Sequence, residues 1–109
     1  MLTVVIPARN EEGTIYALCQ SARQYVEEVI VVDDGSDDAT AQAASEAGAK
    51  IVSNRWRKGY IETIKAGFRQ ASDDIIVTID ADGEHNLEDI PRLGKLIYDD
   101  QADLILGIR

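Results

Sequence analysis

The sequence predicts an α/β protein with a three-layer, doubly wound and mainly parallel sheet. Short apolar runs alternate with amphipathic stretches along all 109 residues, and polar or acidic loops follow the first, second and fourth apolar runs. Strands and helices that alternate in this way form parallel sheets with right-handed crossovers and helices on both faces. We expect the strand order 3-2-1-4-5, which brings the ends of strands one and four side by side at the switch point.

The first half of the chain contains three expected strands and two expected helices. In order, they are strand Leu2–Ile6, a helix over 11–24, strand Val29–Val32, a helix that ends at Ala47, and strand Ala49–Ser53. Pro7 should stop the first strand, and Asn10 is a good N-cap for the first helix. Ser36 or Asp37 can cap the second helix, and Gly48 should end it.

The second half of the chain continues the alternation. The expected elements are a helix over Tyr60–Ala71, strand Ile75–Ile79, a helix from Pro91 to Tyr98, and strand Leu104–Leu106. The unbroken run Ile75–Ile79 is typical of a strand that is buried on both faces. Cys19 falls on the apolar face of the first helix and should lie in the core, and we expect Trp56 to be a packing residue.

Composition narrows the function classes. A length of 109 residues and a hydrophobic content of 45% suit one folded domain, residues 1–109, without an apolar run long enough to span a membrane. The net charge of −9 argues against a nucleic-acid partner, which needs clustered cations. A nucleotide is still compatible, because a bridging divalent cation reverses the local electrostatics. A single cysteine excludes an internal disulfide and favours a cytoplasmic setting.

The stretch after the fourth strand is the most unusual in the chain. Asp80, Asp82 and Glu84 alternate at the end of an apolar run, and Gly83 allows the backbone to turn there. Carboxylates that converge on one point provide the oxygen ligands that Mg²⁺ and Mn²⁺ prefer. The same acids also fit a solvated loop, and we interpret His85 as an ordinary loop histidine.

Two further loops should lie beside this one, namely Pro7–Glu11 after the first strand and 33–38 after the second. Asp34 has a specific use, since an ionised carboxylate only accepts hydrogen bonds and so suits the N3–H of uracil or the N1–H and amine of guanine. The sequence contains neither G-x-G-x-x-G nor a P-loop. Binding of phosphate would therefore depend on a metal and on Arg57, Lys58 or Arg109.

Four blocks together carry a family resemblance. They are VVIPARNEE at 4–12, VIVVDDGSDDAT at 29–40, IDADGEHNLEDIP at 79–91 and GIR at 107–109. In this order they resemble family 2 glycosyltransferases of the GT-A fold, especially transferases that use polyprenyl phosphates, such as dolichyl-phosphate mannose or glucose synthases. The resemblance extends over the whole chain and implies that the fold is the Rossmann-like, nucleotide-sugar-binding half of a GT-A domain.

The resemblance implies a UDP- or GDP-sugar donor, a Mg²⁺ or Mn²⁺ ion, inversion at the sugar carbon, and a polyprenyl phosphate or another acceptor. It implies that Pro7, Arg9 and Glu11 hold the nucleoside and that Asp34 binds the base. Asp80 and Asp82 would hold the metal and the diphosphate, Glu84 would be a further metal ligand, and Arg109 would bind phosphate. Asp82 would be the residue most directly involved in catalysis. Arg9 replaces the usual Tyr, Glu84 replaces the usual Gln, and Gly-Ile-Arg replaces Gly-Ser-Arg.

Catalytic domains of this family are usually much longer, so we expect this chain to be the donor-binding part and to transfer little sugar by itself. Other segments would then provide the acceptor site and any peripheral membrane association, and open sheet edges would favour homo-oligomers. No general base can be assigned, and an ionised polyprenyl phosphate needs none. The rival interpretations are a non-catalytic nucleotide-sugar-binding module and a phosphoacceptor receiver domain.

Overall fold

The structure, a computed structural model, describes residues 2–71, 75–79 and 105–108, and contains a five-stranded parallel sheet in the order β3-β2-β1-β4-β5. The strands are β1 (Leu2–Ala8), β2 (Glu28–Asp34), β3 (Lys50–Asn54), β4 (Ile75–Ile79) and β5 (Ile105–Ile108). The helices are α1 (Ile15–Ala22), α2 (Thr40–Glu46) and α3 (Tyr60–Gln70). The doubly wound fold and its strand order are confirmed. The helix expected from Pro91 to Tyr98 lies outside the described residues.

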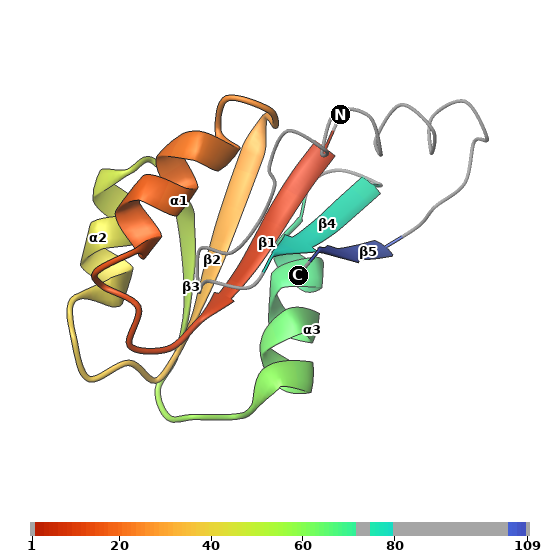
Figure 1. Cartoon of the computed structure of the whole chain (residues 1–109). Coiled ribbons are helices and arrows are strands. Elements are labelled where there is room, and N and C mark those ends of the chain that lie inside the picture. Colours follow the sequence, from red (N-terminus) through yellow and green to blue (C-terminus); the bar gives the residue numbers. More distant parts are fainter. Residues whose placement is uncertain (1, 72–74, 80–104, 109) are drawn as a thin grey trace.

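The sheet is the middle of three layers, with α1 and α2 on one face and α3 on the other (Figure 1). Successive side chains of a strand point to opposite faces, so each central strand contributes to two cores. Val4 and Ile6 of β1 pack on the side of α1, whereas Val5 packs on the side of α3. All three are completely buried, as a parallel sheet with helices on both faces requires.

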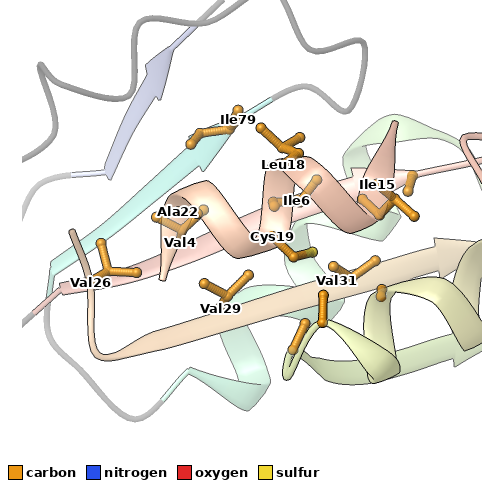
Figure 2. Packing of buried hydrophobic residues seen from close by; sticks show 14 of the residues in the cluster. Val4, Ile6, Ile15, Leu18, Cys19, Ala22, Val26, Val29, Val31 and Ile79 are labelled. Carbon is orange, nitrogen blue, oxygen red and sulfur yellow. The ribbon is translucent and has the colours of Figure 1, made fainter. Parts of the chain in front are cut away.

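The larger core lies between α1, α2 and the sheet, and Figure 2 shows its side chains interlocking. Helix α1 contributes Ile15, Leu18, Cys19 and Ala22 at helical spacing, all of them buried. The prediction that Cys19 is a core residue is confirmed. Burial raises the pKa of its thiol to about 11, so Cys19 is protonated at neutral pH.

On the other face, α3 approaches the sheet closely at Gly67. A Cβ atom at this position would lie 2.3 Å from Cγ1 of Val5 and 3.2 Å from Cγ2 of Val32. Both neighbours are fully buried β-branched residues with little freedom to move aside. The absence of a side chain at Gly67 therefore sets the distance between α3 and the sheet.

We expect Gly67→Ala to lower the free energy of unfolding by about 1–3 kcal/mol, because overpacking outweighs the gain in helix propensity. Chemical denaturation monitored by circular dichroism measures the change. Gly13, around which a Cβ would meet nothing within 4 Å, is the control position, and Gly13→Ala should have little effect. A Gly67→Ala protein as stable as the wild type would contradict this account of the packing.

Several expected boundaries were wrong. Strand β1 runs through Pro7 to Ala8, because Pro7 and Ala8 stay in register with Val32 and Asp33 of the neighbouring strand β2. Helix α1 begins at Ile15 rather than at 11, and α2 begins at Thr40 after Ala39, without a side-chain cap from Ser36 or Asp37. Gly48, with a φ of 92°, follows α2 as predicted.

Candidate functional site

The carboxyl ends of β1 and β2 lie side by side at one edge of the sheet, where Ala8 is paired with Asp33. The loops after these strands and the start of α3 gather at this edge (Figure 1). Strand β4 ends at the same edge, since its residue Thr78 is the partner of Val5. Ligands of doubly wound sheets bind at this edge, so it is the first place to look for a site.

Asn10 joins the first two loops instead of capping a helix. Its backbone N–H donates to Oγ of Ser36 at 2.9 Å, and its side-chain Oδ1 accepts from the N–H of Asp37 at 2.8 Å. Asn10 has a φ of 56°, in the left-handed region that asparagine tolerates better than most residues. Next to it, the N–H of Glu11 donates to the hydroxyl of Thr40 at 2.9 Å. These bonds fix the loop after β1 against the loop after β2.

Asp34, at the end of β2, holds a third segment in place. Its Oδ1 accepts hydrogen bonds from the backbone N–H of Lys58 at 2.7 Å and from the side-chain amide of Asn54 at 2.9 Å. Its Oδ2 accepts from the N–H of Gly59 at 3.0 Å. The neighbouring acid, Asp33, has a different role. It accepts a hydrogen bond from the N–H of Ser36 at 3.1 Å and stabilises the turn that follows β2. Asp34 therefore anchors the segment between β3 and α3.

The same hydrogen bonds keep Asp34 ionised. Burial by itself would raise the pKa of its carboxyl group, but the donors from Lys58, Asn54 and Gly59 stabilise the charged form and together lower the pKa below its usual value. A carboxylate accepts about four hydrogen bonds. The hydroxyl of Thr63 also helps to lower the pKa of Asp34, and it can instead donate to the carbonyl oxygen of Gly59 at 2.7 Å. When it does so, Asp34 can accept a hydrogen bond from a ligand.

A pocket with a volume of about 180 Å³ opens at this edge. Residues from the end of β1, the end of β2 and the start of α3 line it: Pro7, Ala8, Arg9, Asp34, Arg57, Gly59, Tyr60 and Thr63. It combines one anionic acceptor, Asp34, with two exposed guanidinium groups and the partly exposed ring of Tyr60. Such a pocket offers an acceptor for a base N–H, flat surfaces for stacking, and cations for phosphate.

The pocket contains some of the residues that were expected to bind substrate. Pro7, Arg9 and Asp34 line it together, as does Arg57, one of the candidate phosphate ligands. Glu11 is not among the lining residues of the described part, and its backbone instead begins the turn into α1, where its carbonyl oxygen accepts from Ile15 at 2.9 Å.

Tyr60 and Thr63 also line the pocket but were not predicted from the sequence as site residues. They are three residues apart in the first turn of α3 and so share one face of that helix, but tertiary contacts bring this face to the pocket. Trp56 was expected to be a packing residue, but 65% of its surface is exposed, so this prediction was wrong.

The proposed metal ligands Asp80, Asp82 and Glu84 lie outside the described residues, as does Arg109. Within residues 2–71, 75–79 and 105–108, no three histidine, cysteine or acidic side chains form a metal-binding group. Ile79, the last residue of β4, stands at the same edge of the sheet as the pocket, and Asp80 follows it directly.

Comparisons with known proteins agree with one another. The family model described as glycosyl transferase family 2 matches residues 3–109. The undecaprenyl-phosphate 4-deoxy-4-formamido-L-arabinose transferase of Serratia proteamaculans is 36% identical in an alignment that covers 99% of this chain and 36% of that enzyme. The chain thus spans about a third of the length of that relative.

No helix in the part of the chain that the structure describes has the length and apolar character of a membrane span.

Two solved structures have the same fold. Glucosyl-3-phosphoglycerate synthase from Mycobacterium tuberculosis, in complex with Mn²⁺, UDP-glucose and phosphoglyceric acid, superposes with a TM-score of 0.68 at 36% identity. That match covers 75% of this chain and 33% of the synthase. A mycobacterial protein superposes with a TM-score of 0.77 at 32% identity, over 90% of this chain and 37% of that protein.

Proposed function

The chain belongs to glycosyl transferase family 2, and we propose that it binds a UDP-sugar in the pocket at the carboxyl edge of its sheet. The observation that carries this proposal is the buried, ionised carboxylate of Asp34 in a pocket that also contains Arg9, Arg57 and Tyr60. UDP rather than GDP is proposed because the synthase from Mycobacterium tuberculosis, 36% identical, was crystallised with UDP-glucose.

In this proposal each pocket residue has a chemical task. Asp34 accepts the N3–H of uracil, which has a single N–H that can be read in this way. Pro7 and Arg9 form the wall against which the nucleoside lies. Arg57, with Arg109 from the end of the chain, neutralises part of the diphosphate charge. Because the carboxylate of Asp34 is held by three hydrogen bonds before the donor arrives, little ordering of this group is required on binding.

Asp80 and Asp82 would hold the divalent metal beside the diphosphate, with Glu84 as a third ligand and Asp82 as the residue most directly involved in catalysis. The ion, when bound, stabilises the negative charge that develops on the leaving nucleoside diphosphate. The reaction we propose for the whole enzyme is direct displacement with inversion, in which an acceptor oxygen forms a bond to the anomeric carbon while the bond to the diphosphate oxygen breaks. Asp34 and the arginines keep the departing nucleotide aligned for that step.

We propose a polyprenyl phosphate as acceptor, on the basis of the undecaprenyl-phosphate transferase to which the chain is 36% identical. Its phosphate oxygen is ionised at neutral pH and can attack without a general base. The synthase structure instead contains phosphoglyceric acid, a small soluble phosphate compound. Both acceptors are phosphorylated, so an anionic acceptor is common to the two lines of comparison.

A thermal-shift panel tests the donor. UDP-glucose, GDP-mannose and CDP-glucose are each titrated with the chain, with and without Mn²⁺. We expect the melting temperature to rise with the UDP-sugar and more so with Mn²⁺ present, because a ligand that binds only the folded state stabilises it by mass action. Equal shifts with all three nucleotides would show that the base is not recognised, and no shift with any of them would reject donor binding.

Asp82→Asn tests the metal ligands. We expect it to remove most of the gain in UDP affinity that Mn²⁺ provides, while the affinity measured in EDTA stays the same, because an amide is a weaker ligand than a carboxylate for a hard cation. Isothermal titration in Mn²⁺ and in EDTA gives both values. Asp37→Asn, which removes the same charge from an exposed loop residue, is the control. Equal affinity of the wild type in EDTA and in Mn²⁺ would refute a role for the metal in donor binding.

A further inference from the structure

The loop after β3 and the first turn of α3 carry the main exposed apolar surface of the described part of the chain. Four large hydrophobic side chains are exposed in that part, and three of them fall within six residues: Trp56 at 65%, Tyr60 at 47% and Ile61 at 63%. The fourth, Tyr16, belongs to α1. The fold does not use these three side chains for its cores.

Cations alternate with these apolar side chains. Arg55, Arg57 and Lys58 are all exposed, in a chain whose net charge is −9. The two ion pairs found among the described residues involve Lys50 and Lys65, so these three cations have no carboxylate partner in that part of the chain. Arg55–Lys58 with Tyr60 and Ile61 is called the aromatic-basic patch below.

The backbone of this segment is fixed from its inner side. Asp34 accepts the N–H groups of Lys58 and Gly59 at 2.7 and 3.0 Å. At Gly35, a Cβ atom would lie only 2.8 Å from the backbone nitrogen of Arg57, so the two loops are in close contact there. The main chain is therefore held against the body of the protein while its side chains remain exposed. Exposure of the patch is thus a feature of the fold at this place.

We propose that the aromatic-basic patch docks on an anionic lipid bilayer. Arginine and lysine are attracted to anionic headgroups, while tryptophan and tyrosine prefer the interface and isoleucine the acyl boundary. An acidic protein surface would pair with the cations but would leave Trp56 and Ile61 without an apolar partner. The rest of the chain is acidic and is repelled by such a bilayer, so the patch also sets the orientation of the protein.

The location of the patch connects docking to sugar transfer, and here the inference rests on the proposed function. Arg57 and Tyr60 belong to the patch and also line the pocket. A docked protein therefore holds its donor pocket at the membrane surface. A polyprenyl phosphate has its phosphate group at this same surface, so docking would bring the donor close to the acceptor before the reaction.

Trp56 provides the test, because it is the single tryptophan of the chain. Its emission is recorded with vesicles of phosphatidylglycerol and phosphatidylcholine and with vesicles of phosphatidylcholine alone, and binding is measured by co-sedimentation. We expect a shift to shorter wavelength and co-sedimentation with the anionic vesicles only. Both effects should disappear at about 1 M salt, where the Debye length falls to roughly 3 Å.

Variants outside the pocket separate docking from donor binding. Arg55→Gln should weaken partitioning to anionic vesicles about fivefold, the effect expected for one cation near the surface, and Ile61→Ser should weaken it as well. Arg69→Gln and Tyr16→Ser, which remove an exposed cation and an exposed aromatic ring elsewhere, are the matched controls and should partition like the wild type. Without vesicles, Arg55→Gln and Ile61→Ser should bind UDP like the wild type.

Four results would overturn the docking proposal. Three concern vesicles: an unchanged Trp56 emission with anionic vesicles, equal binding to phosphatidylcholine vesicles, and an equal loss of binding in the two control variants. The fourth is a blue shift that follows protein concentration without vesicles, which would assign the patch to contacts between copies. If the chain binds UDP but not vesicles, the docking proposal is rejected and donor binding is kept. If it binds vesicles but not UDP, docking is supported and the proposed donor binding is rejected.

Discussion

Val77→Asp is expected to abolish cooperative folding. Val77 lies at the centre of β4, is completely buried, and is paired with Val4 on one side and Leu106 on the other. An unpaired carboxylate there loses its hydration without gaining a partner, which costs several kcal/mol, and small domains are stabilised by only about 5–15 kcal/mol. Thermal unfolding followed by circular dichroism should show no cooperative transition near that of the wild type.

Two further variants make this test specific. Val77→Ala removes apolar atoms without adding charge and should cost about 2–3 kcal/mol, with a cooperative transition that is kept at a lower temperature. Ser53→Asp places the same carboxylate at an exposed position of β3, beside Asp33 of β2, and should lower the stability by no more than about 1 kcal/mol through like-charge repulsion. A Val77→Asp protein that melts cooperatively at the wild-type temperature would show that β4 is not a central strand.

Asp34→Ala should have the second largest effect, and it should lower both stability and donor affinity. The change removes the acceptor for Lys58, Gly59 and Asn54 at once, which should cost roughly 2–4 kcal/mol since hydrogen bonds to a charged group are the strong ones. With the pocket wall released and the base acceptor gone, UDP affinity should fall at least about tenfold, or 1.4 kcal/mol. Denaturation and isothermal titration measure the two effects.

Two comparisons isolate the carboxylate of Asp34. Asp34→Asn keeps one acceptor oxygen but directs an amide N–H₂ toward the donor of Gly59, so it should lose most of the same stability. Asp37→Asn removes an equal charge from the same loop, where the backbone N–H of Asp37 and not its carboxylate is bonded to Asn10, and should behave like the wild type. If Asp34→Ala bound UDP as tightly as Asp37→Asn, Asp34 would not read the base.

The stability difference between wild type and Asp34→Ala should also depend on pH. The pKa of Asp34 is lowered in the folded state, so its contribution is fully present above the ordinary aspartate pKa of about 3.9 and is lost as the pH falls through the lower, folded-state pKa. The two proteins should therefore differ most at neutral pH and converge in acid.

The fold could be predicted from the sequence because its signals are local and consistent. Runs such as Ile75–Ile79 are too apolar for an exposed strand, and the alternation of strands with helices allows few arrangements. The boundaries were harder to predict, because they depend on tertiary contacts. Asn10 is a good N-cap by its residue type, but its partners Ser36 and Asp37 belong to a loop that lies beside it only in the folded sheet. Such a bond between two loops has no signature in either segment alone.

The candidate site was predicted in part for the same reason. Pro7, Arg9 and Asp34 lie at or just after the carboxyl ends of β1 and β2, where a doubly wound fold binds its ligands, and all three line the pocket. Tyr60 and Thr63 could not be singled out, since they look like ordinary residues of an amphipathic helix. Two contacts of Asp34 decide their place, because the N–H groups of Lys58 and Gly59, which directly precede α3, are bound to this carboxylate at the end of β2.

The central claim is that the pocket between β1, β2 and α3 binds the nucleotide of a sugar donor. Amide chemical-shift mapping of the isotope-labelled chain during a UDP titration in Mg²⁺ tests it most directly. We predict the largest changes at Ala8, Arg9, Gly59, Tyr60 and Thr63, with none at Ala43 of α2 or Lys50 of β3. Saturable binding that leaves the amides of Ala8, Gly59 and Thr63 unmoved, or no change at any amide, would contradict the account.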